Sequence, residues 1–144
     1  MRSDYLNQNS GQTAGYKKKV EEIKVARTLT NDDSGKVFTL SSAGGAYSIT
    51  LPTATSGEEG VHYKFIVKEE TPTAAITIAA GSAIVSFVMK DAGGNASNST
   101  AGTQISNVIV GTSAQKGDYL ELLWTDGEYV GSALSSIDDA ITTS

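Results

Sequence analysis

Few residues in this chain could carry out chemistry. Among its 144 residues the sequence has one histidine, His62, and no cysteine. A single histidine disfavours both a histidine-based catalytic triad and a multi-histidine metal site, and the lack of cysteine excludes thiol catalysis, disulfides and Cys-ligated zinc. His62 also falls on the polar face of a predicted strand, beside Lys64, where we expect a solvent-facing side chain. The sequence therefore predicts a protein that is not an enzyme and needs no cofactor.

Paired acidic residues are the next candidates. They occur in predicted turns or in the C-terminal tail, as Asp32-Asp33, Glu58-Glu59, Glu69-Glu70 and Asp138-Asp139. Adjacent residues of an extended chain point to opposite sides, so such pairs do not form a catalytic dyad. The run NDDSG at 31–35 offers oxygen ligands for a cation but lacks the spacing of an EF-hand loop. We therefore predict no metal site and expect these carboxylates to be solvated.

Lysines at the N-terminal end form the most distinctive charged feature. Lys17, Lys18 and Lys19 are consecutive, and the first 27 residues carry a net charge of +3 whereas the remainder carries −8. Such a basic segment is either a solvated end or a docking arm for an acidic partner. An acidic body repels phosphates, and no aromatic residues alternate with the lysines to stack on bases, so we expect no nucleic-acid partner. No apolar run reaches the length of a membrane span, so no membrane partner is expected either.

Short alternating runs separated by turn residues fill the rest of the chain. They predict about eight strands, at 36–40, 46–51, 62–68, 75–80, 84–89, 104–110, 118–125 and 128–134. In the clearest run Tyr63, Phe65 and Val67 share the inward face. Asp126-Gly127 predicts a two-residue type I′ hairpin that places Trp124 opposite Tyr129. The run 84–89 is apolar on both faces, so one face should meet a second layer or another subunit.

These runs define the expected fold and domain organisation. The fold class is all-β, an antiparallel β-sandwich or jelly-roll-like barrel with an extended N-terminal arm. The expected boundaries are an arm at 1–24, a β-sandwich domain at 25–134 and a C-terminal tail at 135–144. The core residues predicted from the alternation are Phe38, Leu40, Tyr47, Ile49, Leu51, Tyr63, Phe65, Val67, Ile76, Ile78, Phe87 and Trp124.

Two stretches carry a resemblance to a known group of proteins. They are SGKVFTLSSAGGAYSITLPTATSGEEGVHYKFIVKE and GDYLELLWTDGEYVGSAL, which together span roughly residues 30–134. Their order of turns and strands resembles the small β modules of tailed-bacteriophage structural proteins, chiefly capsid decoration (cement) proteins, and also head- and tail-fibre modules. One departure is that Trp124 precedes the Asp-Gly turn, whereas the family often has tryptophan after it.

The resemblance implies a non-enzymatic protein on the outer surface of a virion. It implies a homotrimer bound to the major capsid protein, and the basic arm suits that role because Tyr5, Tyr16, Lys17, Lys18 and Lys19 offer amphipathic and cationic contacts to a capsid or a neighbouring subunit. One alternative is a phage fibre or receptor-binding module that recognises host surface glycans. Another is a small enzyme or metal-dependent binder.

Overall fold

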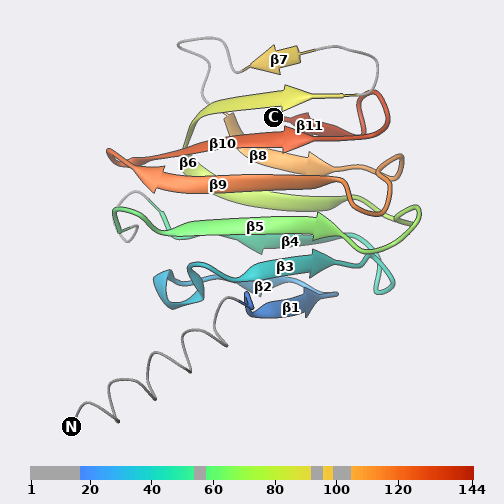
Figure 1. The fold of residues 1–144 in the computed structure, drawn as a ribbon, viewed down its shortest axis with the longest axis horizontal. Coiled ribbons are helices and arrows are strands. Elements are labelled where there is room, and N and C mark those ends of the chain that lie inside the picture. The colour runs from blue at the N-terminus through green and yellow to red at the C-terminus, as the bar shows by residue number, and fades with distance from the viewer. Residues whose placement is uncertain (1–16, 54–57, 92–95, 99–104) are drawn as a thin grey trace, which may run out of the picture.

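The chain folds almost entirely into β-strands (Figure 1). A computed structural model describes residues 17–53, 58–91, 96–98 and 105–144, with the backbone alone for 82–87 and 96–98. A single-turn 3₁₀ helix, η1, spans Asn31–Asp33. The strands within these ranges are β1 (Val20–Ile23), β2 (Arg27–Thr28), β3 (Val37–Leu40), β4 (Tyr47–Thr50), β5 (His62–Val67), β6 (Ile76–Lys90), β7 (Ala96–Asn98), β8 (Ile105–Val110), β9 (Tyr119–Thr125), β10 (Glu128–Leu134) and β11 (Ile141–Thr143).

The strands form two packed layers, so the predicted all-β sandwich is confirmed. The front layer of Figure 1 follows the order β1-β3-β5-β9-β10 and continues into the second half of β6. The back layer contains β2, β4, the first half of β6, β8 and β11. Strand β6 belongs to both layers, and Gly81, with a φ of +64°, lies between the halves that pair in different registers. Glycine adopts this left-handed conformation without steric cost.

The direction of the strands differs from the predicted antiparallel arrangement. β1, β3 and β5 are parallel neighbours in one layer, and β2, β4 and β6 are parallel neighbours in the other. The chain passes from one layer to the other after each of these strands, so it winds as a short parallel coil. The strands after β6 add antiparallel pairs: β8 pairs with β6 and β11 with β8 in the back layer, and β9 pairs with β5 and β10 with β9 in the front layer. The alternation of apolar and polar residues indicates which face of a strand is buried, but it is compatible with parallel and with antiparallel pairing.

The core between the layers consists of the inward faces predicted from the sequence. Phe38 stacks on Phe65 with 5.6 Å between ring centroids. Trp124 lies opposite Tyr129 and meets it edge-on at 4.8 Å, with Asp126 and Gly127 of the connecting turn both at positive φ, as a type I′ hairpin requires. The predicted hairpin and its register are therefore confirmed.

Ten of the twelve predicted core residues are buried. Tyr47 is half-buried, and its hydroxyl donates to the Ile23 carbonyl oxygen at 2.8 Å. Phe87 lies where only the backbone is described. Phe65 and Val67 of β5 lie in register with Phe38 and Leu40 of β3, so the inward side chains of successive turns of the coil pack side by side.

The predicted domain boundaries have to be widened at both ends. The arm was expected at 1–24 and the tail at 135–144, yet β1 pairs with β3 and β11 pairs with β8. Ile23 and Ile141 are both buried in the core. Neither end shows a long alternating run, and these short strands are stabilised by the neighbours that they pair with. The described β domain therefore starts before residue 25 and continues beyond residue 134.

Candidate functional site

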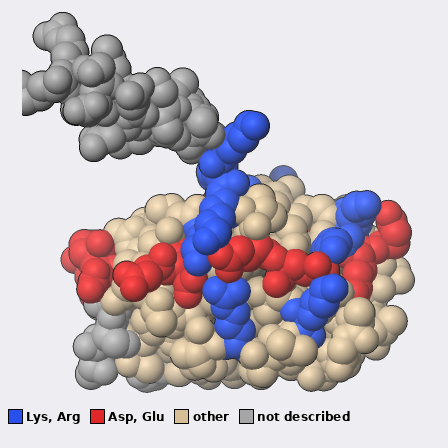
Figure 2. All heavy atoms as spheres, turned by 90° about the horizontal axis from the view of Figure 1, so that it is seen from below, with Lys and Arg blue, Asp and Glu red and all other residues tan. Residues whose placement is uncertain are grey.

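The coil ends in two edge strands, β1 and β2. We use the name open end for these two strands together with η1 and the corner at residues 24–26. Each edge strand has one hydrogen-bonded neighbour among the described residues. Figure 2 looks onto this end and shows a row of acidic side chains flanked by lysine and arginine. Charged side chains are a usual protection of exposed sheet edges against unwanted pairing. The open end is thus built as a charged surface.

Lysines 17, 18 and 19 of the predicted site lead into this end. All three are exposed, and Lys19 forms an ion pair with Glu21 at 3.1 Å. The Lys19 carbonyl oxygen also accepts a hydrogen bond from the backbone N–H of Val37. Tyr5 and Tyr16, the other two predicted site residues, lie outside the described residues. The lysine run therefore stands on the edge of the sheet, where β1 begins.

A network of ion pairs holds the open end together. Arg27 bridges two carboxylates, donating to Glu21 at 2.9 Å and to Asp33 at 3.1 Å. Lys36 bridges the same two, at 3.1 Å from Glu21 and 2.6 Å from Asp33. The second carboxylate oxygen of Asp33 accepts from the backbone N–H of Thr30 and so caps η1. This network links β1, β2, η1 and the start of β3, and charge-assisted bonds of this kind fix geometry.

These contacts change the acidity of the carboxylates. Hydrogen bonds from Arg27, Lys36 and Lys19 lower the pKa of Glu21 from 4.5 to about 2. Burial would raise the pKa of Asp33, but the hydrogen bonds from Lys36 and from the Thr30 N–H, with the charge of Arg27, outweigh it and hold that pKa below its usual value. Both carboxylates are therefore ionised in the folded protein at neutral pH.

We expect acid to weaken the open end. A carboxyl group whose pKa is lower in the folded state stabilises it fully above the unfolded pKa, and this contribution is lost as the pH falls toward the folded pKa. For Glu21 that window runs from about 4.5 down to about 2. The free energy of unfolding, measured by urea denaturation across this range, should fall more steeply in the wild type than in Glu21→Gln. Parallel pH profiles for the two proteins would contradict the assigned role of Glu21.

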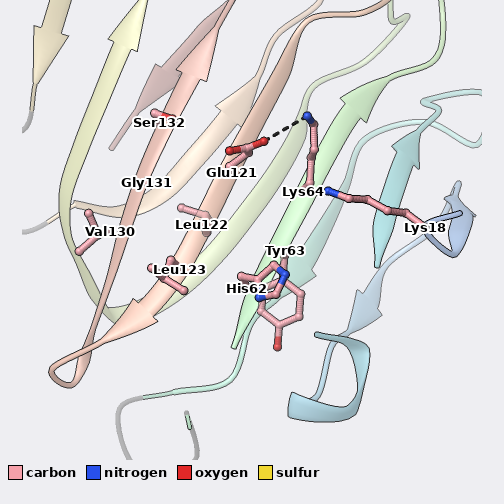
Figure 3. Close-up of a pocket in the computed structure, with 10 residues that line it drawn as sticks. All are labelled: Lys18, His62, Tyr63, Lys64, Glu121, Leu122, Leu123, Val130, Gly131 and Ser132. Atoms are coloured by element: carbon pink, nitrogen blue, oxygen red, sulfur yellow. Dashed lines mark ion pairs between the residues drawn. The ribbon is translucent and has the colours of Figure 1, made fainter. Parts of the chain in front are cut away.

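A groove lies on the outer face of the front layer (Figure 3). It has a volume of about 480 Å³, and its walls come from β5, β9 and β10 with Lys18 at the rim. Lys64 pairs with Glu121 across two strands at 3.1 Å, and its ammonium lies 4.7 Å from the centre of the Tyr119 ring. Leu123 and Val130 supply the aliphatic part of the floor. The groove thus combines one neutralised ion pair with apolar surface.

The aliphatic floor is part of a larger apolar stripe, which we define as Val88, Leu123, Val130 and Leu134. These side chains are 42–50% exposed. Leu123 lies directly opposite Val130, and Val88 lies opposite Ser132, between Val130 and Leu134, so all four share the outer face. The sequence analysis singled out the run 84–89, which contains Val88, but missed Leu123, Val130 and Leu134 as exposed apolar residues. Leu123 and Val130 could have been recognised from the sequence, because they stand at outward positions of strands whose alternation otherwise places polar residues there.

The contact described for the His62 side chain is with a backbone group and not with another titratable side chain. Its side chain is exposed, as predicted, and one ring nitrogen, Nδ1, lies 3.1 Å from the Gly60 carbonyl oxygen. The residues that the structure describes contain no group of three or more His, Cys, Asp or Glu side chains that could hold a metal ion.

The hydroxyl groups of the buried residues Ser41 and Ser42 form hydrogen bonds that stabilise the fold. Ser41 donates to one Glu69 carboxylate oxygen at 2.5 Å and Ser42 donates to the other at 2.8 Å. The Ser42 oxygen also accepts from the Thr73 backbone N–H at 2.7 Å. These bonds tie the corner after β3 to the one after β5, so both hydroxyls are already engaged.

The described helical segment is a single 3₁₀ turn, and no described helix could cross a membrane. In comparisons with known proteins, the chain matches no family model and no curated protein, so interpretation of the site rests on its geometry.

Proposed function

We propose that this protein is a phage capsid decoration (cement) protein. In this role it binds the outer surface of the major capsid shell as a homotrimer and stabilises the shell without catalysing a reaction. The observation that carries the proposal is the exposed run of Lys17, Lys18 and Lys19 at the open end, where Lys19 joins the network of ion pairs through Glu21. A rigid domain that presents a basic segment at one end is suited to docking on an acidic surface.

The lysine run supports docking because little in the domain neutralises it. Lys19 is 69% exposed even with Glu21 as a partner, whereas Arg27 and Lys36 are engaged in the network. Exposed cations attract an acidic partner over about one Debye length, roughly 8 Å at physiological ionic strength. Binding that depends on these lysines should therefore weaken as salt is added.

We expect Lys17→Glu/Lys18→Glu to bind undecorated capsid shells about tenfold more weakly than the wild type. Tenfold corresponds to about 1.4 kcal/mol, a reasonable sum for two reversed charges at a binding surface. Lys90→Glu/Lys116→Glu is the matched control, because it changes the net charge equally at exposed lysines of the same domain. Occupancy is measured by co-sedimentation of protein with shells at low and high salt.

Three results would contradict the proposal. The first is equal binding of the two double variants at low salt, and the second is a difference between them that does not shrink at high salt. The third is failure of the wild type to bind shells at all. The melting temperatures of both variants should stay close to that of the wild type, since the substituted side chains are exposed.

The groove supports one alternative, a fibre or receptor-binding module that recognises host surface glycans. Its walls offer hydrogen-bonding groups from His62, Lys64, Glu121 and Ser132 around an apolar floor. A glycan array separates the two roles. Selective binding that is lost in Lys64→Ala, together with no affinity for shells, would favour the fibre module.

A further inference from the structure

We propose that β1 pairs with β1 of a second copy of this chain. The two strands run antiparallel and are centred on Val20, so the front layers of the two copies join into one continuous sheet. This contact goes beyond the proposed function, because pairing about a two-fold axis joins copies in twos and does not close a ring of three. It needs no capsid shell and is tested with the protein alone.

The outer edge of β1 presents backbone groups in the geometry that a further strand needs. Among the described residues the hydrogen-bonded neighbour of β1 is β3. The carbonyl oxygens of Lys19 and Ile23 accept from backbone N–H groups at the start of β3 and just after it. Successive residues of a strand direct their N–H and C=O groups to opposite sides, so those of Val20 and Glu22 point away from β3. Such an edge is a template for pairing with another chain.

The charges along this edge are complementary to the same segment read in reverse. The segment is KKKVEEI, with Val20 at its centre. In an antiparallel pair centred on Val20, Lys19 of one copy lies opposite Glu21 of the other. Lys18 lies opposite Glu22 in the same way, and the symmetry repeats both contacts. Opposite charges at facing positions of antiparallel strands stabilise the pairing, so β1 is a suitable partner for itself.

The same charges disfavour the neighbouring registers. Centring the pair on Lys19 would bring the two copies of Lys19 face to face. Centring it on Glu21 would bring the two copies of Glu21 together and place Lys18 opposite Lys24. Like charges directly opposite each other destabilise a strand pair. The charges that protect this edge from other strands therefore leave the register centred on Val20 open to a second copy.

Both glutamates already contact lysines, and the pairing exchanges the most exposed of these contacts. Lys19 pairs with Glu21 at 3.1 Å and Lys24 pairs with Glu22 at 3.5 Å, with lysine side chains that are 69% and 57% exposed. Ion pairs between such exposed lysines contribute little to stability, so a lysine of the second copy replaces either one at little cost. Lys68 keeps its shorter contact with Glu22, at 2.7 Å.

The gain from pairing comes mainly from the backbone and from Val20. Val20 is 59% exposed, and the two-fold axis sets it against Val20 of the second copy. Residues that face each other with their N–H and C=O groups exchange two hydrogen bonds, so the pairs at Val20 and at Lys18 with Glu22 form about six. A contact through one strand is smaller than a standard protein interface, so the association is weak and depends on protein concentration.

Disulfide trapping tests the register directly, because the chain has no cysteine of its own. Val20→Cys faces itself across the two-fold axis with Cα atoms about 5.5 Å apart, a distance that a disulfide spans. After oxidation it should run as a covalent dimer on a non-reducing gel. Thr28→Cys, at an exposed position of the other edge strand β2, is the control and should stay single. An equimolar mixture of Lys18→Cys and Glu22→Cys should give a dimer that neither variant gives alone.

A proline at the centre of the pair tests the backbone contact. Val20→Pro removes the N–H that points to the free edge, but it leaves the hydrogen bonds to β3 and all three lysines in place. Val20→Thr keeps the N–H and is the matched control. In sedimentation velocity at about 0.15 M salt, where distant charges are screened, the mean mass should rise with protein concentration for the wild type and Val20→Thr. It should rise much less for Val20→Pro.

Three results would overturn the pairing. The first is equal disulfide yield for Val20→Cys and Thr28→Cys, and the second is no dimer in the mixture of Lys18→Cys and Glu22→Cys. The third is association of Val20→Pro that equals that of Val20→Thr. A disulfide between Val20→Cys and Thr28→Cys that exceeds the Val20→Cys dimer would mean that β1 pairs with β2 of the second copy, which also contradicts the proposal.

Charge reversal replaces the proline test if Val20→Pro lowers the melting temperature. Lys18→Glu alone and Glu22→Lys alone should each associate about tenfold more weakly than the wild type, because like charges then face each other. Their equimolar mixture should recover the association, since opposite charges face each other again, and a mixture as weak as its components would overturn the pairing. Val20→Pro keeps the lysine run, so its binding to shells reports on the proposed function separately.

Discussion

Replacing Phe65 by alanine is expected to lower the free energy of unfolding by about 3–5 kcal/mol. The Phe65 ring is fully buried, stacks on Phe38 and lies 6.4 Å from the Tyr63 ring. Its strand joins the parallel coil to the antiparallel hairpin, since β5 pairs with β3 on one side and β9 on the other. Phe65→Ala therefore leaves a cavity between the parallel coil and the antiparallel hairpin. Movement of only one of these two parts would not fill it. Urea denaturation followed by tryptophan fluorescence would measure the loss.

Lys64→Ala is the control for Phe65→Ala, because it changes the adjacent residue on the opposite face. Lys64 is partly exposed, and its partner Glu121 has a side chain that is 53% exposed. An ion pair of this kind contributes at most about 1 kcal/mol. If Lys64→Ala were the more damaging substitution, the inward face of β5 would be assigned wrongly.

Replacing Asp33 by alanine is expected to cost about 2–3 kcal/mol. Asp33 is 8% exposed and accepts hydrogen bonds from Arg27, Lys36 and the Thr30 N–H. Its removal leaves Arg27 and Lys36 with Glu21 as the remaining carboxylate that both contact, and it removes the cap of η1. Because Arg27 also lies over the Phe38 ring, at 5.3 Å from its centre, the disturbance should reach the core.

Asp32→Ala tests whether the effect belongs to the network. Asp32 is the exposed neighbour of Asp33 in the same turn. Its replacement should change the free energy of unfolding by no more than about 0.5 kcal/mol, as is usual for exposed positions. Comparable losses for the two variants in urea would mean that the local acidic charge, and not the geometry around Asp33, stabilises the turn.

The two regions that support the proposed roles have different physical characters. The open end is charged and ordered by its own ion pairs, so it suits salt-dependent contacts with an acidic partner. The apolar stripe contributes surface whose burial is worth roughly 25 cal/mol per Å² and changes little with salt. Salt should therefore affect the proposed shell binding more strongly than any contact made through the apolar stripe.

The sequence alone determined the features that depend on near neighbours in the chain. A period of two residues identifies the inward side of β5, with Phe65 at its centre, because successive side chains of a strand point to opposite faces. The pair Asp126-Gly127 specifies a type I′ turn, and that turn sets Trp124 against Tyr129. The run of Lys17, Lys18 and Lys19 was likewise evident as a basic segment outside the core.

Only the tertiary structure decided which strands pair, in which direction, and which side chains meet across them. Strands β1, β3 and β5 are parallel neighbours although other strands separate them in the chain. The alternation of apolar and polar residues in a strand does not specify the direction of the strand that pairs with it. For the same reason the sequence did not bring Glu21 together with Lys36, or Leu123 together with Val88 on one outer face. Those contacts depend on which strands pair within the front layer and in which register, and pairing between strands far apart in the chain is decided by the packing of the whole core.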